Sequence, residues 1–156
     1  MILKEWDVFK IPEYMGERRM RRMEPRSPSI WDTPAPRSFK LNFNGAYKGN
    51  LGPAGYGSVI RNSEGIIQGI QWGYMGKNTN NAAELEGHIA GTQWALRQQW
   101  TPLIVEGDSR VIIVMADKIQ KGKGANSVGK NWRLEARLRN LETMLRDSPA
   151  IIFRHV

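Results

Sequence analysis

The feature that most constrains this chain is a change in its hydrophobic period at about residue 80. Before that point, residues alternate as in a half-buried strand: within Lys40–Ala46, Leu41 and Phe43 face one side and the asparagines face the other. After it, apolar residues such as Leu85 and Ile89 recur at helical spacing. A domain that begins with strands and continues with helices belongs to the mixed α/β class.

This pattern predicts three strands, a helix, a strand, two helices and a final strand. The strands are expected at Lys40–Ala46, Ser58–Arg61, Ile66–Met75, Leu103–Val105 and Ala150–Val156. The helices are expected from a cap at Asn80 or Asn81 to about Trp100, over Arg110–Ile119, and on the stripe formed by Leu134, Leu138, Leu141 and Leu145. The stretches KGNLGPAGYG and NSEG are expected to be turns. An antiparallel meander followed by crossover strands predicts a mixed five-stranded sheet flanked by helices.

Length and composition exclude several classes of protein. At 156 residues the chain can form one cored domain and an appendage. It has no cysteine, which excludes disulfides, thiolate metal sites and a cysteine nucleophile, and its two histidines are too few for a histidine-rich zinc site. The 23 basic residues outnumber the 15 acidic ones and give a formal net charge of +8, so polyanions are the natural partners.

The chain contains no apolar run long enough to span a membrane, and charges interrupt its N-terminus where a secretory signal would be apolar. We therefore expect an intracellular protein without a membrane partner. A nuclear and an organellar location both remain open.

Residues 1–38 differ from the rest of the chain and are predicted to be a basic, proline-rich N-terminal arm. Five prolines interrupt any regular element, and the arm contains the arginine-rich run ERRMRRMEPR. Two interpretations stay open: a disordered tail, or a segment that orders on a protein, a ribonucleoprotein or nucleic acid. The domain itself is expected over residues 39–156.

Three polar residues stand where side chains of such a sheet converge on one cleft. Asn44 lies on the first strand, Glu84 in the expected first turn of the first helix, and Asp108 just beyond the fourth strand. Each has an ordinary alternative, because an acid near a helix start favours the helix dipole and an Asp before Ser is commonly a helix cap.

The flanking sequence resembles the type 1 ribonuclease H family, and most closely its plant retroelement-like branch. The matching stretches are KLNFNGAYKGNLGPAGYGSVIRNSEG, TNNAAELEGHIAGTQWAL and LIVEGDSRVII. The resemblance implies hydrolysis of the RNA strand of an RNA·DNA hybrid, with two divalent cations, usually Mg²⁺, held by four carboxylates. It implies that Glu84 and Asp108 are the second and third of these carboxylates.

The sequence departs from the family at the first carboxylate. Asn44, in FNG, stands where the family has an aspartate, and an amide offers a carbonyl oxygen without charge. In the plant-like branch the fourth carboxylate follows a His-Val pair by several residues, and the printed sequence stops at His155 and Val156, so the domain is expected to be truncated at its C-terminus. With two charges of four, occupancy by two Mg²⁺ ions and ordinary turnover are in doubt.

The resemblance also implies contacts to nucleic acid. The residues expected to make them are Gly45, Asn80, Asn81, Lys121, Lys123, Lys130 and Arg133. The first three would approach the RNA backbone and its 2′-hydroxyls, and the basic ones would bind phosphates without reading sequence. A turn glycine, a helix cap and a solvated loop are the alternatives at these positions.

Two functions therefore stay open. One is a protein that binds RNA·DNA hybrid, or RNA, and cleaves weakly or not at all. The other is a pseudo-enzyme that serves as an RNA-binding structural subunit of a larger ribonucleoprotein complex. The sequence leaves open whether the chain is an enzyme, whether Asn44 is natural or engineered, and whether the chain continues past Val156.

Overall fold

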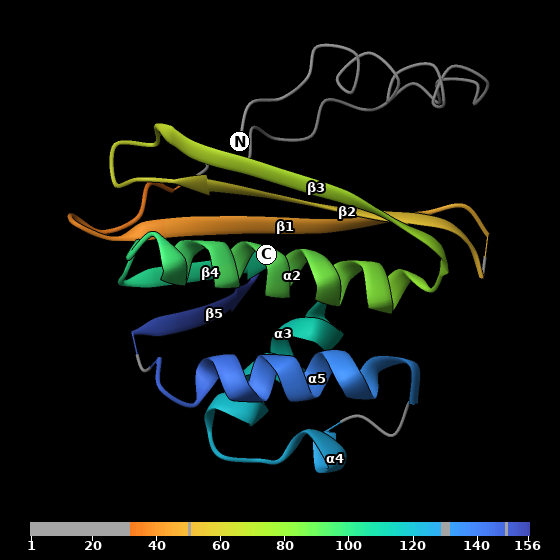
Figure 1. Ribbon diagram of the computed structural model, residues 1–156. Coiled ribbons are helices and arrows are strands. Elements are labelled where there is room, and N and C mark those ends of the chain that lie inside the picture. The colour runs from red at the N-terminus through yellow and green to blue at the C-terminus, as the bar shows by residue number, and fades with distance from the viewer. Residues whose placement is uncertain (1–31, 50, 129–131, 149) are drawn as a thin grey trace, which may run out of the picture. The chain divides into compact units, whose positions relative to one another are not determined.

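The computed structural model describes residues 32–49, 51–128, 132–148 and 150–156 (Figure 1). The chain divides into two compact units, Met1–Asp32 and Thr33–Val156. The described residues fall almost entirely in the second unit. The predicted arm therefore lies mostly outside them, and the arginine-rich run lies wholly outside.

Five strands form one mixed sheet in the order β3-β2-β1-β4-β5. Their bounds are β1 Phe39–Tyr47, β2 Gly52–Arg61, β3 Ile67–Asn78, β4 Leu103–Gly107 and β5 Ile151–His155. The first three strands pair antiparallel, whereas β1 with β4 and β4 with β5 pair parallel. The predicted fold class, a mixed five-stranded sheet flanked by helices, is confirmed.

The helices lie on the sheet in two layers. Their bounds are α2 Asn80–Arg97, α3 Arg110–Gln120, α4 Ala125–Val128 and α5 Trp132–Leu145. Helix α2 packs along β1 and β2, and α5 packs against α2 and α3 (Figure 1). The predicted leucine stripe of α5 is confirmed, since all four leucines are buried.

Strand β2 begins earlier than predicted, because the second half of the glycine-rich stretch, from Gly52 on, is strand, whereas Lys48, Gly49 and Leu51 form the turn. Its register pairs Gly57 with Asn44 and Gly55 with Ala46, and the same residues also pair with β3. Glycine has low strand propensity, but pairing on both sides overrides it. The Tyr56 ring covers Gly73, where a β-carbon would come within 2.6 Å of the ring. Small residues here allow an aromatic ring to lie flat on the sheet.

Two glycines one turn apart let α2 approach the sheet closely. A β-carbon at Gly91 would lie 2.6 Å from Leu41 Cδ1, and one at Gly87 would lie 3.2 Å from the Asn44 carbonyl oxygen. The buried core, which includes Leu41, Phe43 and Leu85, fills the space between this helix and the sheet. The close approach fixes the height of α2 above β1.

The short helix α4 was not predicted and lies in a stretch that reads as a loop. Ala125 is buried, and its backbone N–H donates a hydrogen bond to Glu142 Oε2 of α5 at 3.3 Å. This tertiary contact, which no local pattern encodes, orders the segment.

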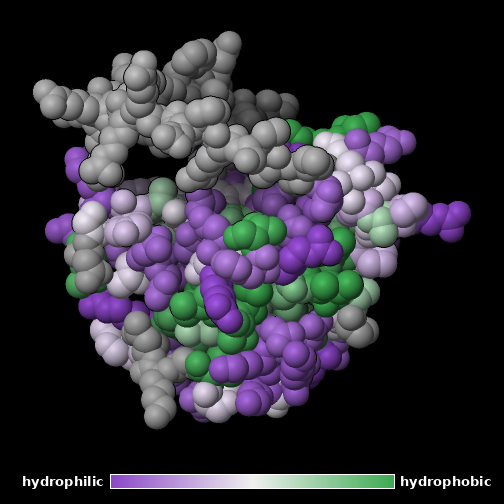
Figure 2. Space-filling view, turned by 180° about the vertical axis from the view of Figure 1, so that it is seen from behind, coloured by the Kyte–Doolittle hydropathy of each residue, from purple (hydrophilic) through white to green (hydrophobic). Residues whose placement is uncertain are grey.

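No helix in the described part of the chain is both long and apolar enough to cross a bilayer. On the side turned away from the view of Figure 1, the surface is mainly hydrophilic, with hydrophobic patches between the polar side chains (Figure 2).

Candidate metal and nucleic-acid site

The three predicted site residues lie on elements that meet at one edge of the sheet. Asn44 is on β1, Asp108 directly follows β4, and β1 and β4 are neighbouring parallel strands. Glu84 projects from α2, which packs on β1. The Glu84 and Asp108 carboxylates are close enough for the Asp108 charge to raise the pKa of Glu84.

Gly45, the residue after Asn44 on β1, packs directly against the backbone of α2 at Glu84. A β-carbon at Gly45 would lie 2.5 Å from the Glu84 backbone nitrogen and 2.8 Å from the Ala83 carbonyl carbon. The Gly45 backbone N–H also donates a hydrogen bond to the Glu84 carboxylate. The close packing of β1 on α2 is a sufficient reason for glycine here, and the predicted contact of Gly45 with nucleic acid stays a prediction.

Glu84 is an unusual carboxyl group, because it is buried beside a second acid. The residue is only 4% exposed, and among the described residues its Oε2 atom has no hydrogen-bond partner. Burial, and then the Asp108 charge, raise the pKa of Glu84 to about 7, and the Gly45 N–H partly opposes this. A cation at this position would stabilise the ionised form of Glu84.

The expected position of Glu84 in the first turn of its helix is wrong. The N-cap of α2 is Thr79, whose Oγ1 accepts a hydrogen bond from the Ala82 N–H at 3.2 Å. Glu84 is thus the fifth helical residue, and the first turn of α2, which is described in full, contains no acid. A role for Glu84 at the helix dipole is therefore excluded.

The predicted cap at Asn80 or Asn81 is wrong for the same reason, since Thr79 takes that position. Both asparagines lie in the first turn of α2, with Asn80 partly exposed and Asn81 exposed. Their side chains are placed at the helix N-terminus, where backbone N–H groups favour anions such as phosphate. Their predicted contacts to RNA stay predictions.

Asp108 occupies the connection between β4 and α3. The residue is exposed, and the N-cap of α3 is Ser109, so Asp108 is not a helix cap. The backbone carbonyl of Asp108 lies 3.1 Å from Nε2 of His155, the last residue of β5. Sequence reasoning did not assign His155 to the site, and the only signal would have been the pairing of β4 with β5.

The donor set fits one divalent cation better than two. Glu84 and Asp108 supply two carboxylates, Asn44 supplies an uncharged oxygen, and hard oxygen donors suit Mg²⁺. The unpartnered Glu84 oxygen is the atom that a cation would bind first. Within the described ranges, no cluster of three or more His, Cys, Asp or Glu residues could hold a metal. The four-carboxylate arrangement is therefore not assembled by these residues.

The predicted basic contacts lie after α3 and at the start of α5. Lys121 and Lys123 are exposed, and Lys121 Nζ lies 2.7 Å from Asp117 Oδ2. Lys130 lies outside the described residues. The Arg133 guanidinium stacks over the Trp132 ring, 4.6 Å from its centroid, and Trp132 is 73% exposed. An exposed aromatic ring beside cations suits nucleic acid, and the predicted contacts in this region stay predictions.

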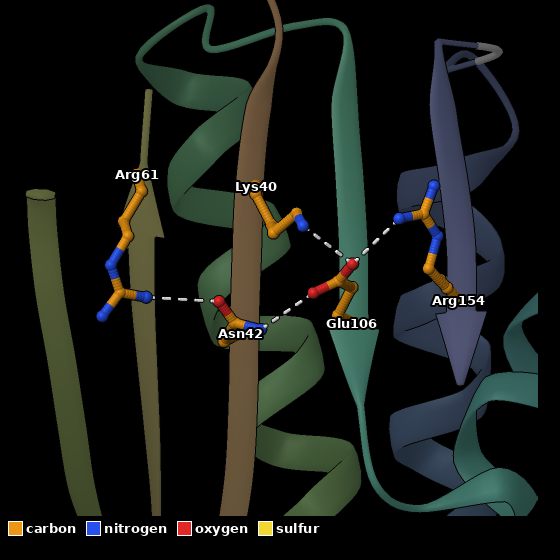
Figure 3. Close-up of polar contacts among 5 residues, drawn as sticks. All are labelled: Lys40, Asn42, Arg61, Glu106 and Arg154. Carbon is orange, nitrogen blue, oxygen red and sulfur yellow. Dashed lines mark hydrogen bonds and ion pairs between the residues drawn. The ribbon is translucent and has the colours of Figure 1, made fainter. Parts of the chain in front are cut away.

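A charged network that sequence reasoning missed crosses the face of the sheet turned away from α2 (Figure 3). Glu106 Oε1 lies 3.0 Å from Lys40 Nζ and 3.3 Å from an Arg154 nitrogen, and its Oε2 accepts a hydrogen bond from Asn42. Asn42 in turn accepts one from Arg61. These contacts link β2, β1, β4 and β5. Asn42 on β1 and Glu106 on β4 lie two residues before Asn44 and Asp108, respectively. They fix the register of the two strands that carry the site.

The strand order, the parallel pairing of β1 with β4, and carboxylates at their shared edge together define a ribonuclease H-like domain. Residues 42–145 match the family model described as reverse transcriptase-like. The chain belongs to this family.

Curated relatives are similar over part of their length. A ribonuclease H of Pseudomonas fluorescens is 33% identical over 99 residues, which cover 62% of this chain and 54% of that protein. Ribonuclease HI of Synechocystis is 32% identical over 102 residues, covering 65% of this chain and 60% of that protein. The chain thus spans little more than half of these relatives.

Solved structures share the fold. The N-terminal RNase H domain of Rv2228c from Mycobacterium tuberculosis superposes with a TM-score of 0.66 at 25% identity, covering 76% of this chain and 86% of that one. The LC11 RNase H1, solved in complex with RNA/DNA hybrid, gives a TM-score of 0.61 at 23% identity over 76% and 85% of the two chains.

Proposed function

We propose that the chain binds RNA·DNA hybrid at the edge that carries Asn44, Glu84 and Asp108, and that hydrolysis of the RNA strand is impaired. One observation carries this proposal: a buried, unpartnered carboxylate stands beside a second carboxylate, with an amide where a further acid would complete the set. Membership of the family and the ribonuclease H names of the relatives support the substrate class. The matched stretches favour the plant retroelement-like branch.

Each residue has a separate task in this proposal. Glu84 and Asp108 would hold Mg²⁺, and the Asn44 side chain would offer a neutral oxygen. When bound, the cation would supply Lewis-acid activation of a water molecule and of the leaving oxygen. The Gly45 N–H orients the Glu84 carboxylate by its hydrogen bond.

Charge explains the impairment. Two Mg²⁺ ions carry four positive charges, whereas the ionised Glu84 and Asp108 side chains carry only two negative charges. An amide cannot bridge two metal ions as a carboxylate does, because it has one weakly basic oxygen and no charge. We therefore expect weak occupancy of the second cation position and slow turnover.

The hybrid itself would be held by groups around this edge. Lys121, Lys123 and Arg133 would contact phosphates, and Trp132 offers a stacking surface. The first turn of α2, with Asn80 and Asn81, presents backbone N–H groups and amides to an RNA backbone. Such contacts bind nucleic acid without reading its sequence.

The test is cleavage and binding of an end-labelled RNA·DNA hybrid by the wild type and by Asn44→Asp, in Mg²⁺ and in Mn²⁺. We expect both proteins to bind hybrid at low salt and the variant to cleave faster. Asn140→Asp, which adds the same charge at an exposed position of α5, is the matched control and should cleave like the wild type. Absence of hybrid binding by all three proteins would overturn the proposal.

The second candidate, an RNA-binding subunit of a ribonucleoprotein, is favoured by the same amide at Asn44. It differs in what Asn44→Asp does: in a repurposed subunit the substitution leaves cleavage undetectable, and the protein binds RNA alone as well as hybrid. The complex would then sediment as a large particle that ribonuclease treatment breaks down, with the arm of residues 1–38 as the expected contact to its partner.

A further inference from the structure

The end of β5 binds the backbone carbonyl groups on either side of the Asp108 Cα atom. Strand β5 runs parallel to β4, and His155 is the register partner of Gly107. The Val156 N–H donates a hydrogen bond to the Gly107 carbonyl at 3.1 Å, and His155 Nε2 lies 3.1 Å from the Asp108 carbonyl oxygen. Two successive carbonyl groups are thus bound from one strand end.

The direction of the His155 contact follows from its partner. A backbone carbonyl only accepts, so Nε2 of His155 must carry the hydrogen and donate it. The neutral tautomer with hydrogen on Nε2 and the imidazolium both donate there. His155 is therefore the donor in this hydrogen bond, which points to a role in orientation.

A contact from outside the turn matters for Asp108, because the turn itself constrains the position of this residue little. The N-cap of α3, Ser109, makes no side-chain capping bond in the described structure, although a capping bond is the usual constraint at a helix start. Asp108 is also exposed, so burial does not fix its side chain. Among the described residues, the side-chain hydrogen bond to the Asp108 backbone comes from His155.

Strand β5 is itself anchored to the core beneath the site. The Phe153 ring stacks on His88 of α2 at 5.4 Å, and His88 meets Phe43 of β1 edge to face at 5.2 Å. Gly107 packs against the same Phe43 ring, where a β-carbon would come within 2.3 Å. This layer of rings packs β5 against β1, which carries Asn44, and against α2, which carries Glu84. A hydrogen bond from β5 therefore positions Asp108 relative to Asn44 and Glu84.

We propose that His155 is a positioning residue for Asp108: its Nε2–H holds the Asp108 carbonyl and thereby keeps the exposed carboxylate facing Glu84. The inference rests on the proposed function, since a cation held by these two carboxylates would depend on the position of Asp108. Groups that orient metal ligands in this way typically change metal affinity by about 10- to 100-fold when removed.

Three substitutions separate this role from a merely structural one. His155→Gln can place an amide N–H near the Nε2 position, whereas His155→Asn is too short and His155→Phe keeps a flat ring without a donor. By calorimetry with Mg²⁺ or Mn²⁺ alone, we expect Asn and Phe to weaken binding about 10-fold or more and Gln to stay within about 3-fold of the wild type. His155 is exposed, so the thermal midpoints of all variants should remain close.

A second measurement needs no metal. The carbonyl ¹³C resonance of Asp108 in the metal-free full chain should move upfield in the Asn and Phe variants, because a lost hydrogen bond shields that carbon, and should hardly move in the Gln variant. If the wild-type protein binds neither cation, the proposed metal-holding role of Glu84 and Asp108 fails, and the carbonyl shift still tests whether His155 positions Asp108. Equal affinities and equal shifts in all four proteins would overturn the positioning role.

Discussion

Gly45 donates its backbone N–H to the Glu84 carboxylate and lies so close to Glu84 that no β-carbon fits between strand and helix. A β-carbon would come within 2.5 Å of the Glu84 nitrogen, which is backbone and cannot turn aside. The position of the Glu84 carboxylate is therefore set by the packing of β1 on α2, not by the side chain of Glu84 alone.

Gly45→Ala should destabilise the fold by about 1 to 3 kcal/mol, because overpacking against backbone forces the strand and helix apart. It should also weaken Mg²⁺ binding through the displaced Glu84. Gly57→Ala is the matched control, since a β-carbon there would meet its nearest atom, Gln71 O, at an ordinary 3.9 Å. Urea unfolding of both variants checks this, and equal stabilities would contradict the packing argument.

The raised pKa of Glu84, about 7 in the folded protein against an ordinary value of 4.5, makes metal-free stability depend on pH. The folded protein holds a proton that the unfolded chain releases, so stability is fully present below pH 4.5 and is lost as pH rises through 7. The loss should be roughly 3 kcal/mol for this shift. Glu84→Gln should abolish this pH dependence of stability.

Denaturant unfolding across this pH range, with chelator present, measures the effect. Added Mg²⁺ should restore stability at the alkaline end in the wild type and leave Glu84→Gln unaffected, because the cation binds the ionised carboxylate. A wild-type profile that is flat between pH 4.5 and 7 would show that Glu84 is not buried beside Asp108 as described.

The Lys40–Glu106 pair should be costly to break because both side chains are buried, at 2% and 5% exposure. Glu106→Gln leaves the buried Lys40 charge without its carboxylate and should destabilise the protein by about 3 to 5 kcal/mol. Glu135→Gln, which breaks the exposed pair with Arg139, is the control and should cost under about 1 kcal/mol. If the two variants unfold at the same urea concentration, the network in Figure 3 does not stabilise the fold more than an exposed ion pair does.

The basic residues after α3 should govern the salt dependence of hybrid binding. The double variant Lys121→Ala/Lys123→Ala should lower the slope of log affinity against log salt by about 2, roughly one for each lysine that contacts a phosphate. Fluorescence anisotropy with a labelled hybrid at several salt concentrations gives the slope. Arg146→Ala, at an exposed position beyond the end of α5, should leave it unchanged; an equal drop there would mean a general charge effect.

The fold was largely predictable because its signals are local. The alternation of Leu41 and Phe43 and the leucine stripe of α5 each report a buried face directly. The extent of β2 was not predictable in this way, since Gly55 and Gly57 are strand only because β1 and β3 pair with them on both sides. Short helix α4 likewise depends on a contact with Glu142, distant in sequence.

The candidate site was predictable in its residue types and less so in its geometry. Asn44, Glu84 and Asp108 follow from motif spacing, and the structure places them on elements that share one sheet edge. The cap at Thr79 was missed because the adjoining asparagines are equally good caps by residue type. Glu106 and His155 were missed because their partners come from other strands, and a linear pattern contains no such pairing.

The most direct test of the account is the rate of cleavage of an RNA·DNA hybrid, in Mg²⁺, by the wild type and by Asn44→Asp under single-turnover conditions. We predict slow or undetectable cleavage by the wild type and a rate at least about 10-fold higher in the variant, since the added carboxylate would supply a charged metal ligand. Rapid cleavage by the wild type, with no gain on restoring the aspartate, would contradict it.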